Sequence, residues 1–368
     1  MPDLGIRLQL LVGATIPLPA SFGLTDSLLE VEVYNNDEQP DAFRMTLALG
    51  RDSLLEYGLL GSGALDPPSR IVIIVLVKAL PQVLIDGIVT HHQVQTRGQP
   101  GQSRLIVTGD DFTRKLDLDP RSATYPNQPD SAIVTQLLGR YAGLVPVVTT
   151  TTDTPAETDR IPSQQETDLA CIRRLAQRNG FVFYIEPTDV PAVNTAYWGP
   201  DNRLGLPQPA LSQNMGPATN IEDLSFSFDA LAPITPVISI VEPFTQQTIQ
   251  IPVPAGLSPA LSAATSAPLR TSLPRDTANL SFTEALRQAL AMVTDSSDSV
   301  TGQGMLDALR YGRALRSRRL VDVRGAGQSY DGTYYVKQVT HHLQRGQYRQ
   351  SFTLKRGGLG SIAQRVAV

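Results

Sequence analysis

Short apolar runs rich in β-branched residues limit the possible folds of this chain more than any other feature of its sequence. The longest run, Ile71–Val77, has seven residues and ends at Lys78. Seven residues are far short of the roughly 20 that a membrane-spanning helix needs, so we expect a buried strand and no membrane segment. Similar runs at 28–36, 43–49, 83–96 and 103–109 are separated by Asn, Asp, Gly or Pro and predict further strands. Residues 1–110 therefore predict a compact β domain.

The charge balance and the cysteine count exclude several classes of function. Lysine and arginine total 31 against 35 aspartate and glutamate, so the net charge is −4 and there is no basic surplus for tight binding to nucleic acid. Cys171 is the single cysteine, which excludes an intrachain disulfide and a cysteine-rich metal site. The N-terminus carries Asp3 and no long apolar core, so we expect no signal peptide.

Helical spacing replaces the strand pattern in the middle of the chain. Apolar residues recur at i+4 over 130–143, which predicts a helix capped by its first residue, an aspartate. A second helix is expected from the capping-box spacing of Ser163 and Glu166 to the Asn-Gly pair at 179–180, with a strand after it. We therefore predict an inserted α+β module over 111–219.

Strand patterns return in the last third of the chain, where 220–360 predict a second β domain followed by a short tail at 361–368. The proline- and alanine-rich stretch 252–274 is typical of an exposed connector. Two further helices are expected around 281–293 and 305–318, before the closing strands.

All four histidines occur as two adjacent pairs in matching surroundings. Each pair, His91-His92 and His341-His342, follows an Asp-Gly and a Val-Thr and precedes a glycine turn and a strand. This pattern describes a β-hairpin used twice, which predicts two copies of one β domain in the chain. Chance similarity of two unrelated hairpins is the alternative.

The sequence gives little support for catalytic or metal-binding residues. Adjacent histidines on a strand point to opposite faces, so neither pair can easily share one ion, and we expect no metal. Cys171 lies among apolar helix positions and is expected to be a small buried residue. The pairs Asp110-Asp111 and Asp117 with Asp119 suit turns and caps better than acid-base chemistry. No nucleotide-binding or nucleophile motif occurs, so we expect no catalytic residue, no cofactor and no enzyme.

Six arginines lie between positions 310 and 324. In a net acidic chain such a cluster favours a protein interface over contact with nucleic acid. The predicted interface residues are Arg310, Arg313, Arg316, Arg318 and Arg319, with Arg324 completing the cluster.

Three segments carry a resemblance to a known family. They are GDDFTRKLDL running on to YPNQPDSAIVTQLLGRYAG, then QQETDLACIRRLAQRNGFVFYIEP, and finally LDALRYGRALRSRRLVDVRGAGQSYDGTYYVKQVTHHLQRGQYRQSFTLKRGGLGS. Together they resemble the phage late control protein D family of tail and baseplate hub proteins, which are similar to the hub half of type VI secretion VgrG spikes. Spike-fused relatives continue beyond the position of Gly360, so the chain resembles a stand-alone hub.

The resemblance implies a mainly β fold with two tube-like β-barrel domains and the inserted module. It implies a homotrimer whose six β domains form a pseudo-hexameric ring, with an inner tube protein above, a trimeric spike protein below and other baseplate proteins around it. Assembly is expected in the bacterial cytoplasm, as part of a phage tail or a contractile injection particle. A tail-associated cell-wall hydrolase and a surface-polymer binding module are the alternatives.

Overall fold

The structure of the chain is a computed structural model. It describes residues 5–14, 16–50, 57–99, 101–155, 157–158, 161–201, 203–241, 248–253, 261–273, 286, 289–290, 292–293 and 296–362.

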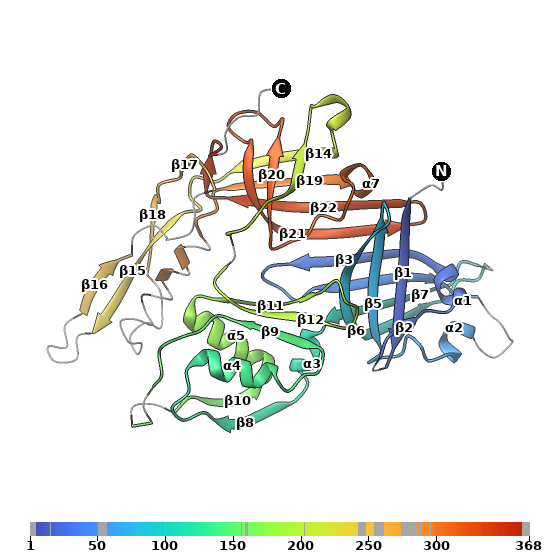
Figure 1. The fold of residues 1–368 in the computed structure, drawn as a ribbon, viewed down its shortest axis with the longest axis horizontal. Helices are drawn as coiled ribbons and strands as arrows, with labels where there is room; N and C mark the ends of the chain where they lie inside the picture. The colour runs from blue at the N-terminus through green and yellow to red at the C-terminus, as the bar shows by residue number, and fades with distance from the viewer. Residues whose placement is uncertain are drawn as a thin grey trace.

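A single 13-stranded sheet dominates the molecule, so the prediction of a mainly β fold is confirmed (Figure 1). Most of it follows the order β14-β19-β22-β21-β3-β4-β7-β6-β5-β1-β2, and β20 joins β13 to β21 beside that path. The strands are β1 (Ile6–Gly13), β2 (Leu18–Pro19), β3 (Leu28–Asn36), β4 (Ala42–Ala48), β5 (Arg70–Val77), β6 (Leu80–Gln95), β7 (Arg104–Asp111), β13 (Gln208–Ser212), β14 (Ile221–Phe228), β19 (Val300–Asp307), β20 (Leu320–Arg324), β21 (Gly332–Gln344) and β22 (Gln347–Arg356).

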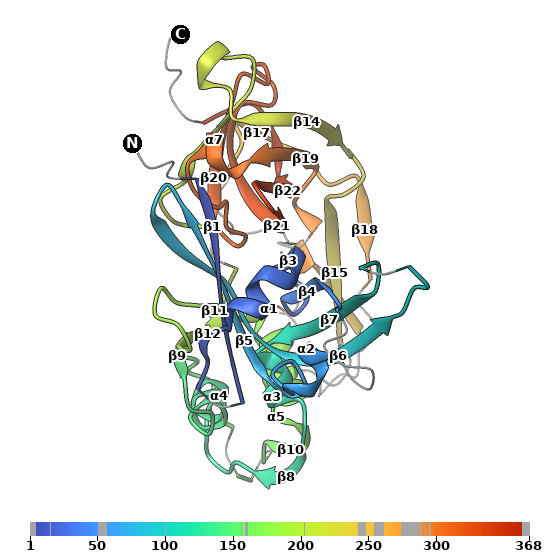
Figure 2. The same ribbon diagram turned by 90° about the vertical axis from the view of Figure 1, so that its right-hand side faces the viewer.

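A smaller α+β unit lies at one end of the molecule, away from both chain termini (Figures 1 and 2). It contains α3 (Thr113–Leu116), β8 (Pro120–Thr124), α4 (Asp130–Leu138), β9 (Leu144–Val148), β10 (Ser163–Thr167), α5 (Asp168–Asn179), β11 (Val182–Pro187) and β12 (Asn194–Gly199). We call this unit the module. Its interior is a hydrophobic cluster of its own, which includes Ile133, Ile172 and Trp198.

The remaining elements are short helices beside the main sheet and an arm that extends from it (Figure 1). The helices are α1 (Phe22–Ser27), α2 (Gly58–Gly61), the 3₁₀ turn η1 (Gly216–Ala218) and α7 (Ala308–Tyr311). The arm and its neighbours are β15 (Ile234–Val241), β16 (Thr248–Pro252), β17 (Ala264–Thr265), β18 (Arg270–Ser272) and β23 (Gly358–Leu359). In the part of the chain that the structure describes, no helix is long and apolar enough to cross a membrane.

The main sheet contains the same order of five antiparallel strands twice. The first set is β3-β4-β7-β6-β5 and the second is β14-β19-β22-β21-β20. In each set a short helix, α2 or α7, follows the second strand in the chain, and a helical turn, α1 or η1, precedes the first. We call the two sets the first and second repeats. Their common order agrees with two copies of one β unit.

A β-bulge fixes how the two repeats correspond, residue by residue. The bulge residue is Thr90 in β6 and Lys337 in β21. The amide just before each bulge donates to a carbonyl just before β5 or β20, at 2.9 Å in both repeats. Matching the bulges places His91 opposite Gln338 in the alignment and His341 opposite Val94. The hairpins are therefore equivalent in topology, whereas the histidine pairs lie three residues apart.

One pairing within the chain joins the two repeats. The first part of β21 pairs with β20, and Gln338–Gln344 beyond the bulge pairs antiparallel with Glu30–Asn36 of β3. We call this pairing the inner junction. One hydrophobic core runs beneath it, because Val33 and Phe43 of the first repeat pack with Val339 and Phe352 of the second.

Three predicted helices differ from the structure. The helix expected over 130–143 is α4, which ends at Leu138, and Asp130 lies inside it instead of capping it. The segment 305–318 continues β19 to Asp307 and is helical only in α7, which Gly312 ends with φ +88°. The expected capping box at 163–166 is strand β10, and α5 begins later, where the Thr167 hydroxyl accepts from the Ala170 amide. Most of the predicted helix 281–293 lies outside the described residues.

Candidate functional site

Around the inner junction the main sheet has one apolar and one polar face. Burial alternates along β3, where Val31 and Val33 are buried and Glu30 and Glu32 are not, and it alternates equally along β22. Residues two apart on a strand share a face, so the core lies on one side and a polar surface covers the other. This polar face is a candidate functional surface.

Charged groups of both signs lie on the polar face. Glu32 accepts from the Tyr34 hydroxyl at 2.8 Å, and its carboxylate lies 3.4 Å from Nδ1 of His342. Arg349 of β22 binds Glu222 of β14 at 3.1 Å. The face therefore carries hydroxyls, amides and charges of both signs instead of a block of one sign.

Within the described residues, the outer side of β14 and the last part of β6 have no strand partner. Strand β14 pairs only with β19, and β6 has no partner on its outer side after Ile88. Each open edge exposes one large apolar side chain, Val94 of β6 at 36% and Phe228 of β14 at 44%. Unpaired backbone groups beside exposed apolar side chains are typical of an edge that receives another strand.

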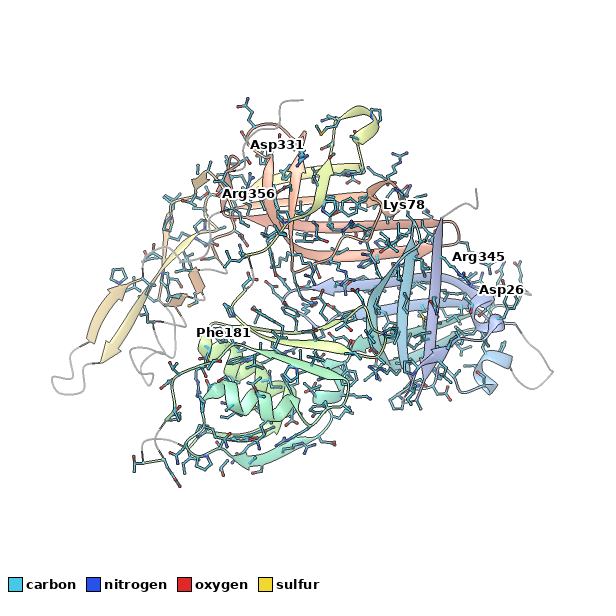
Figure 3. The ribbon with its side chains drawn as sticks, viewed as in Figure 1. Asp26, Lys78, Phe181, Asp331, Arg345 and Arg356 are labelled. Carbon is cyan, nitrogen blue, oxygen red and sulfur yellow. The ribbon has the colours of Figure 1, made fainter. Side chains whose placement is uncertain are left out.

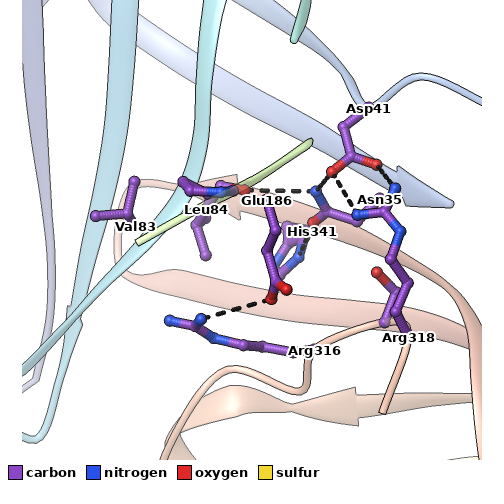
Figure 4. A pocket seen from close by; sticks show the side chains of 10 residues that line it. Asn35, Asp41, Val83, Leu84, Glu186, Arg316, Arg318 and His341 are labelled. Carbon is purple, nitrogen blue, oxygen red and sulfur yellow. Dashed lines mark hydrogen bonds and ion pairs between the residues drawn. The ribbon is translucent and has the colours of Figure 1, made fainter. Parts of the chain in front are cut away.

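A buried arginine joins both repeats to the module (Figure 4). Arg318, just before β20, donates from Nη1 and Nη2 to the two carboxylate oxygens of Asp41, at 3.1 and 2.7 Å. Its guanidinium also lies 4.5 Å from the ring centroid of Tyr184 in β11. Burial, with the nearby charge of Asp41, raises the pKa of Asp111 to about 7. We call this cluster the joint.

His341 belongs to the same network and is neutral. Asn35 donates through its amide nitrogen to Asp41, so its Oδ1 faces His341 Nε2, 2.8 Å away, as an acceptor. Nε2 therefore carries the proton, and Nδ1 accepts from the Tyr348 hydroxyl at 2.6 Å. Burial lowers the pKa of His341 to about 3.

Replacing His341 by glutamine is expected to change how stability depends on pH. Between about pH 6.5 and pH 3 the unfolded chain binds a proton at His341 that the folded chain does not. His341 therefore contributes a loss of about 1.4 kcal/mol of unfolding free energy per pH unit as the pH falls through this window, and His341→Gln lacks this contribution. The raised pKa of Asp111 acts in the opposite direction and is common to both proteins. Urea unfolding at several pH values checks this, and parallel profiles would contradict it.

The predicted arginine interface divides in two. Arg318 is buried in an ion pair within the chain and is not available to a partner, which corrects the prediction for that residue. Glu186 of β11 forms ion pairs with two arginines: its Oε1 lies 3.8 Å from Nη1 of Arg316 and 2.8 Å from Nη2 of Arg319. These pairs fasten the module to the second repeat. The structure leaves Arg310 and Arg313 exposed, together with Arg324.

A second buried ion pair fastens the module to the first repeat. Arg70 of β5 donates to both carboxylate oxygens of Asp86 in β6, at 2.7 and 2.6 Å. Asp86 also accepts from the Asn194 amide of β12 at 2.9 Å, and Arg70 donates to the carbonyl of Ala192 at 3.0 Å. The module therefore has a polar attachment to each repeat.

Most of the other candidate residues from the sequence are buried or paired within the chain. Cys171 is buried in α5, and burial raises the pKa of its thiol to about 11. Asp111 accepts from the backbone amides of Asp41 and Thr113, at 2.9 Å each. Asp117 accepts from the Thr167 hydroxyl, Asp110 pairs with Arg114, and Asp119 is exposed.

The other three histidines have different neighbours. His91 is exposed on β6. Nδ1 of His92 lies 3.7 Å from a carboxylate oxygen of Asp66, and the ring of His342 faces Glu32. Among the described residues there is no group of three or more His, Cys, Asp or Glu side chains that could hold a metal ion.

Sequence reasoning did not single out Asn35, Asp41 or Glu186. Arg318 was noticed only as one of a cluster of like charges. Its partner Asp41 lies 277 positions away in the chain, so no local spacing connects the two residues.

Comparison with known proteins gives one family model and several solved structures. The model, described as the Alg8 N-terminal domain, matches residues 25–199. No curated protein sequence matches the chain. A tail protein from Neisseria meningitidis has a TM-score of 0.64 at 15% identity, over 97% of this chain and 98% of its own. The 43 kDa tail protein of prophage MuSo2 from Shewanella oneidensis has a TM-score of 0.65 at 11% identity, over 96% and 99%.

A third structure is a component of the type VI secretion system of Escherichia coli, described as structurally similar to tail proteins of bacteriophage T4. It matches with a TM-score of 0.56 at 14% identity, over 92% of this chain and 77% of its own. The chain therefore has the fold of phage and prophage tail proteins, a fold that it shares with this secretion component.

Proposed function

We propose that the chain is a structural hub of the late control protein D type, in which three copies form a pseudo-hexameric ring between a sixfold inner tube and a threefold spike. The ring would be part of a phage tail or a contractile injection particle and would be assembled in the bacterial cytoplasm beside other baseplate proteins. The function is mechanical and needs no catalytic residue.

The observation that carries the proposal is the repeated strand order. Each chain holds two β units of the same topology, β3-β4-β7-β6-β5 and β14-β19-β22-β21-β20. The inner junction joins these units by one strand pairing, and each unit keeps one open strand side, on the last part of β6 and on β14. Two different edges that complement each other make a head-to-tail interface, which closes into a ring when the rotation permits.

The number three follows from the symmetries to be matched. A chain with two like units presents six units when three copies meet. A sixfold tube can stack on six like units, while a threefold spike contacts three identical chains. The repeat within the chain thus explains how one protein contacts both partners.

The polar face suits the lining of a passage. Its hydroxyls and amides can hydrogen-bond to water, and it carries charges of both signs, such as the pair of Arg349 with Glu222. A lining without a positive surplus would not retain a passing polyanion or acidic protein. We propose that this face borders the central channel of the ring.

Native mass spectrometry of the full chain tests the proposal, alone and with candidate tube and spike proteins. We expect a species of three times 39.8 kDa that binds three spike chains and six tube subunits. A chain that stays monomeric at micromolar concentration, alone and with spike protein present, would overturn the hub function.

A further inference from the structure

We propose that the ring closes by strand pairing between protomers, in which β6 of one chain pairs antiparallel with β14 of the next, in a register copied from the inner junction. This inference rests on the proposed hub function and deepens it, because it assigns the residues that face one another. The occupant of each open edge is a second copy of this chain.

The inner junction supplies the template. Beyond its bulge, β21 pairs with β3 so that Gln338 lies opposite Asn36, His341 opposite Val33 and Gln344 opposite Glu30. The equivalents of these two strands are β6, whose outer side is open after Ile88, and β14. The pairing made once inside the chain therefore has a second, unfilled counterpart, formed by the open sides of β6 and β14.

The correspondence between β3 and β14 follows from strand pairing alone. Gly109 and Leu354 are equivalent, since each pairs with the residue just before its bulge, Val89 or Val336. From Gly109 the ladder runs to Phe43 and then Val33, and from Leu354 it runs to Gly302 and then Phe226. Val33 and Phe226 are therefore equivalent, and the register of the inner junction transfers without adjustment.

The transferred register brings chemically matched residues together. On the core side it places Val94 opposite Phe226 and His92 opposite Phe228, which covers the two exposed apolar side chains of the open edges. On the polar side it places Gln93 opposite Ser227. At the end of the pairing it places Arg97 opposite Asp223, two side chains of opposite charge.

None of this complementarity entered the derivation of the register, which used only backbone pairing. A shift of one residue would turn every side chain of one strand to the other face and set Val94 against a serine. The match of apolar with apolar and of basic with acidic residues is independent support for this register.

A cysteine pair on the polar side tests the register. The variant Gln93→Cys with Ser227→Cys changes two exposed positions on strands that do not pair with each other within one chain. Directly opposite residues on antiparallel strands have Cα atoms about 4.5–5.5 Å apart, within the range of a disulfide. We expect mild oxidation to convert most of the trimer into a covalent trimer on non-reducing gels. Cys171 adds no background because it is buried and its thiol pKa is raised to about 11.

The matched control is Gln93→Cys with Asp223→Cys, which moves one cysteine four residues along β14. At about 3.3 Å per residue the two sulfur atoms would be roughly 13 Å apart, so we expect at least tenfold less cross-linking. A trimer that cross-links neither pair, or both equally, would overturn the register and leave the trimer standing. A chain that forms no trimer would overturn the hub function and this inference with it.

Discussion

Replacing Arg318 by alanine is expected to lower the free energy of unfolding by about 3–5 kcal/mol. The substitution removes both hydrogen bonds to Asp41 and the contact with the Tyr184 ring. Asp41 would then keep a buried negative charge beside Asp111 without its compensating cation. The loss acts on the β3–β4 loop, the second repeat and the module together, so we also expect faster proteolysis between the module and the sheet. Urea unfolding of wild type and variant measures the difference.

Two further variants separate the ion pair from general damage to the loop. Arg313→Ala removes an exposed arginine from the same loop and is expected to change stability by less than about 0.5 kcal/mol. The double variant Arg318→Ala with Asp41→Asn removes the stranded charge as well, and it should recover part of the loss. An Arg318→Ala protein within about 1 kcal/mol of wild type would contradict the role assigned to the joint.

Strands were predictable from the sequence because the pattern of apolar and polar side chains along a strand follows which of its faces are buried. The run at 71–77 became β5, Arg70–Val77, whose residues are nearly all buried, and the pattern at 28–36 became β3 with the expected alternation. The segment 305–318 misled because Leu306 and Leu309 lie three residues apart, a spacing that also fits one face of a helix. In the structure Leu306 belongs to a strand, since Val300–Asp307 completes the sheet between β14 and β22.

The repeat was visible in the sequence, but its register was not. The histidine pairs suggested an alignment that the bulges at Thr90 and Lys337 shift by three residues. A bulge is a backbone feature that changes which residues face each other without a fixed residue signature. The inner junction and the joint were equally hidden, because Gln338 pairs with Asn36 and Arg318 with Asp41 across about three quarters of the chain.

Placing a lysine at either open edge is expected to abolish the trimer while leaving each chain folded. In Val94→Lys or Phe228→Lys the new ammonium points to solvent in the free chain, because both positions are partly exposed there. In the ring it would lie against the core side of the neighbouring strand, where an unpaired charge costs several kcal/mol. A cost of about 3 kcal/mol at each junction weakens each association more than 100-fold. Native mass spectrometry and far-ultraviolet circular dichroism should therefore show a folded monomer.

The control for this loss is a lysine on the same strand away from the open edge. Leu80 begins β6, is 52% exposed, and lies where β6 already pairs with β5. Leu80→Lys adds the same charge to the same strand, so any general effect of charge on solubility or association would appear there too. We expect it to remain trimeric. Trimers of equal stability from Val94→Lys, Phe228→Lys and Leu80→Lys would show that the open edges of β6 and β14 do not meet in the assembly.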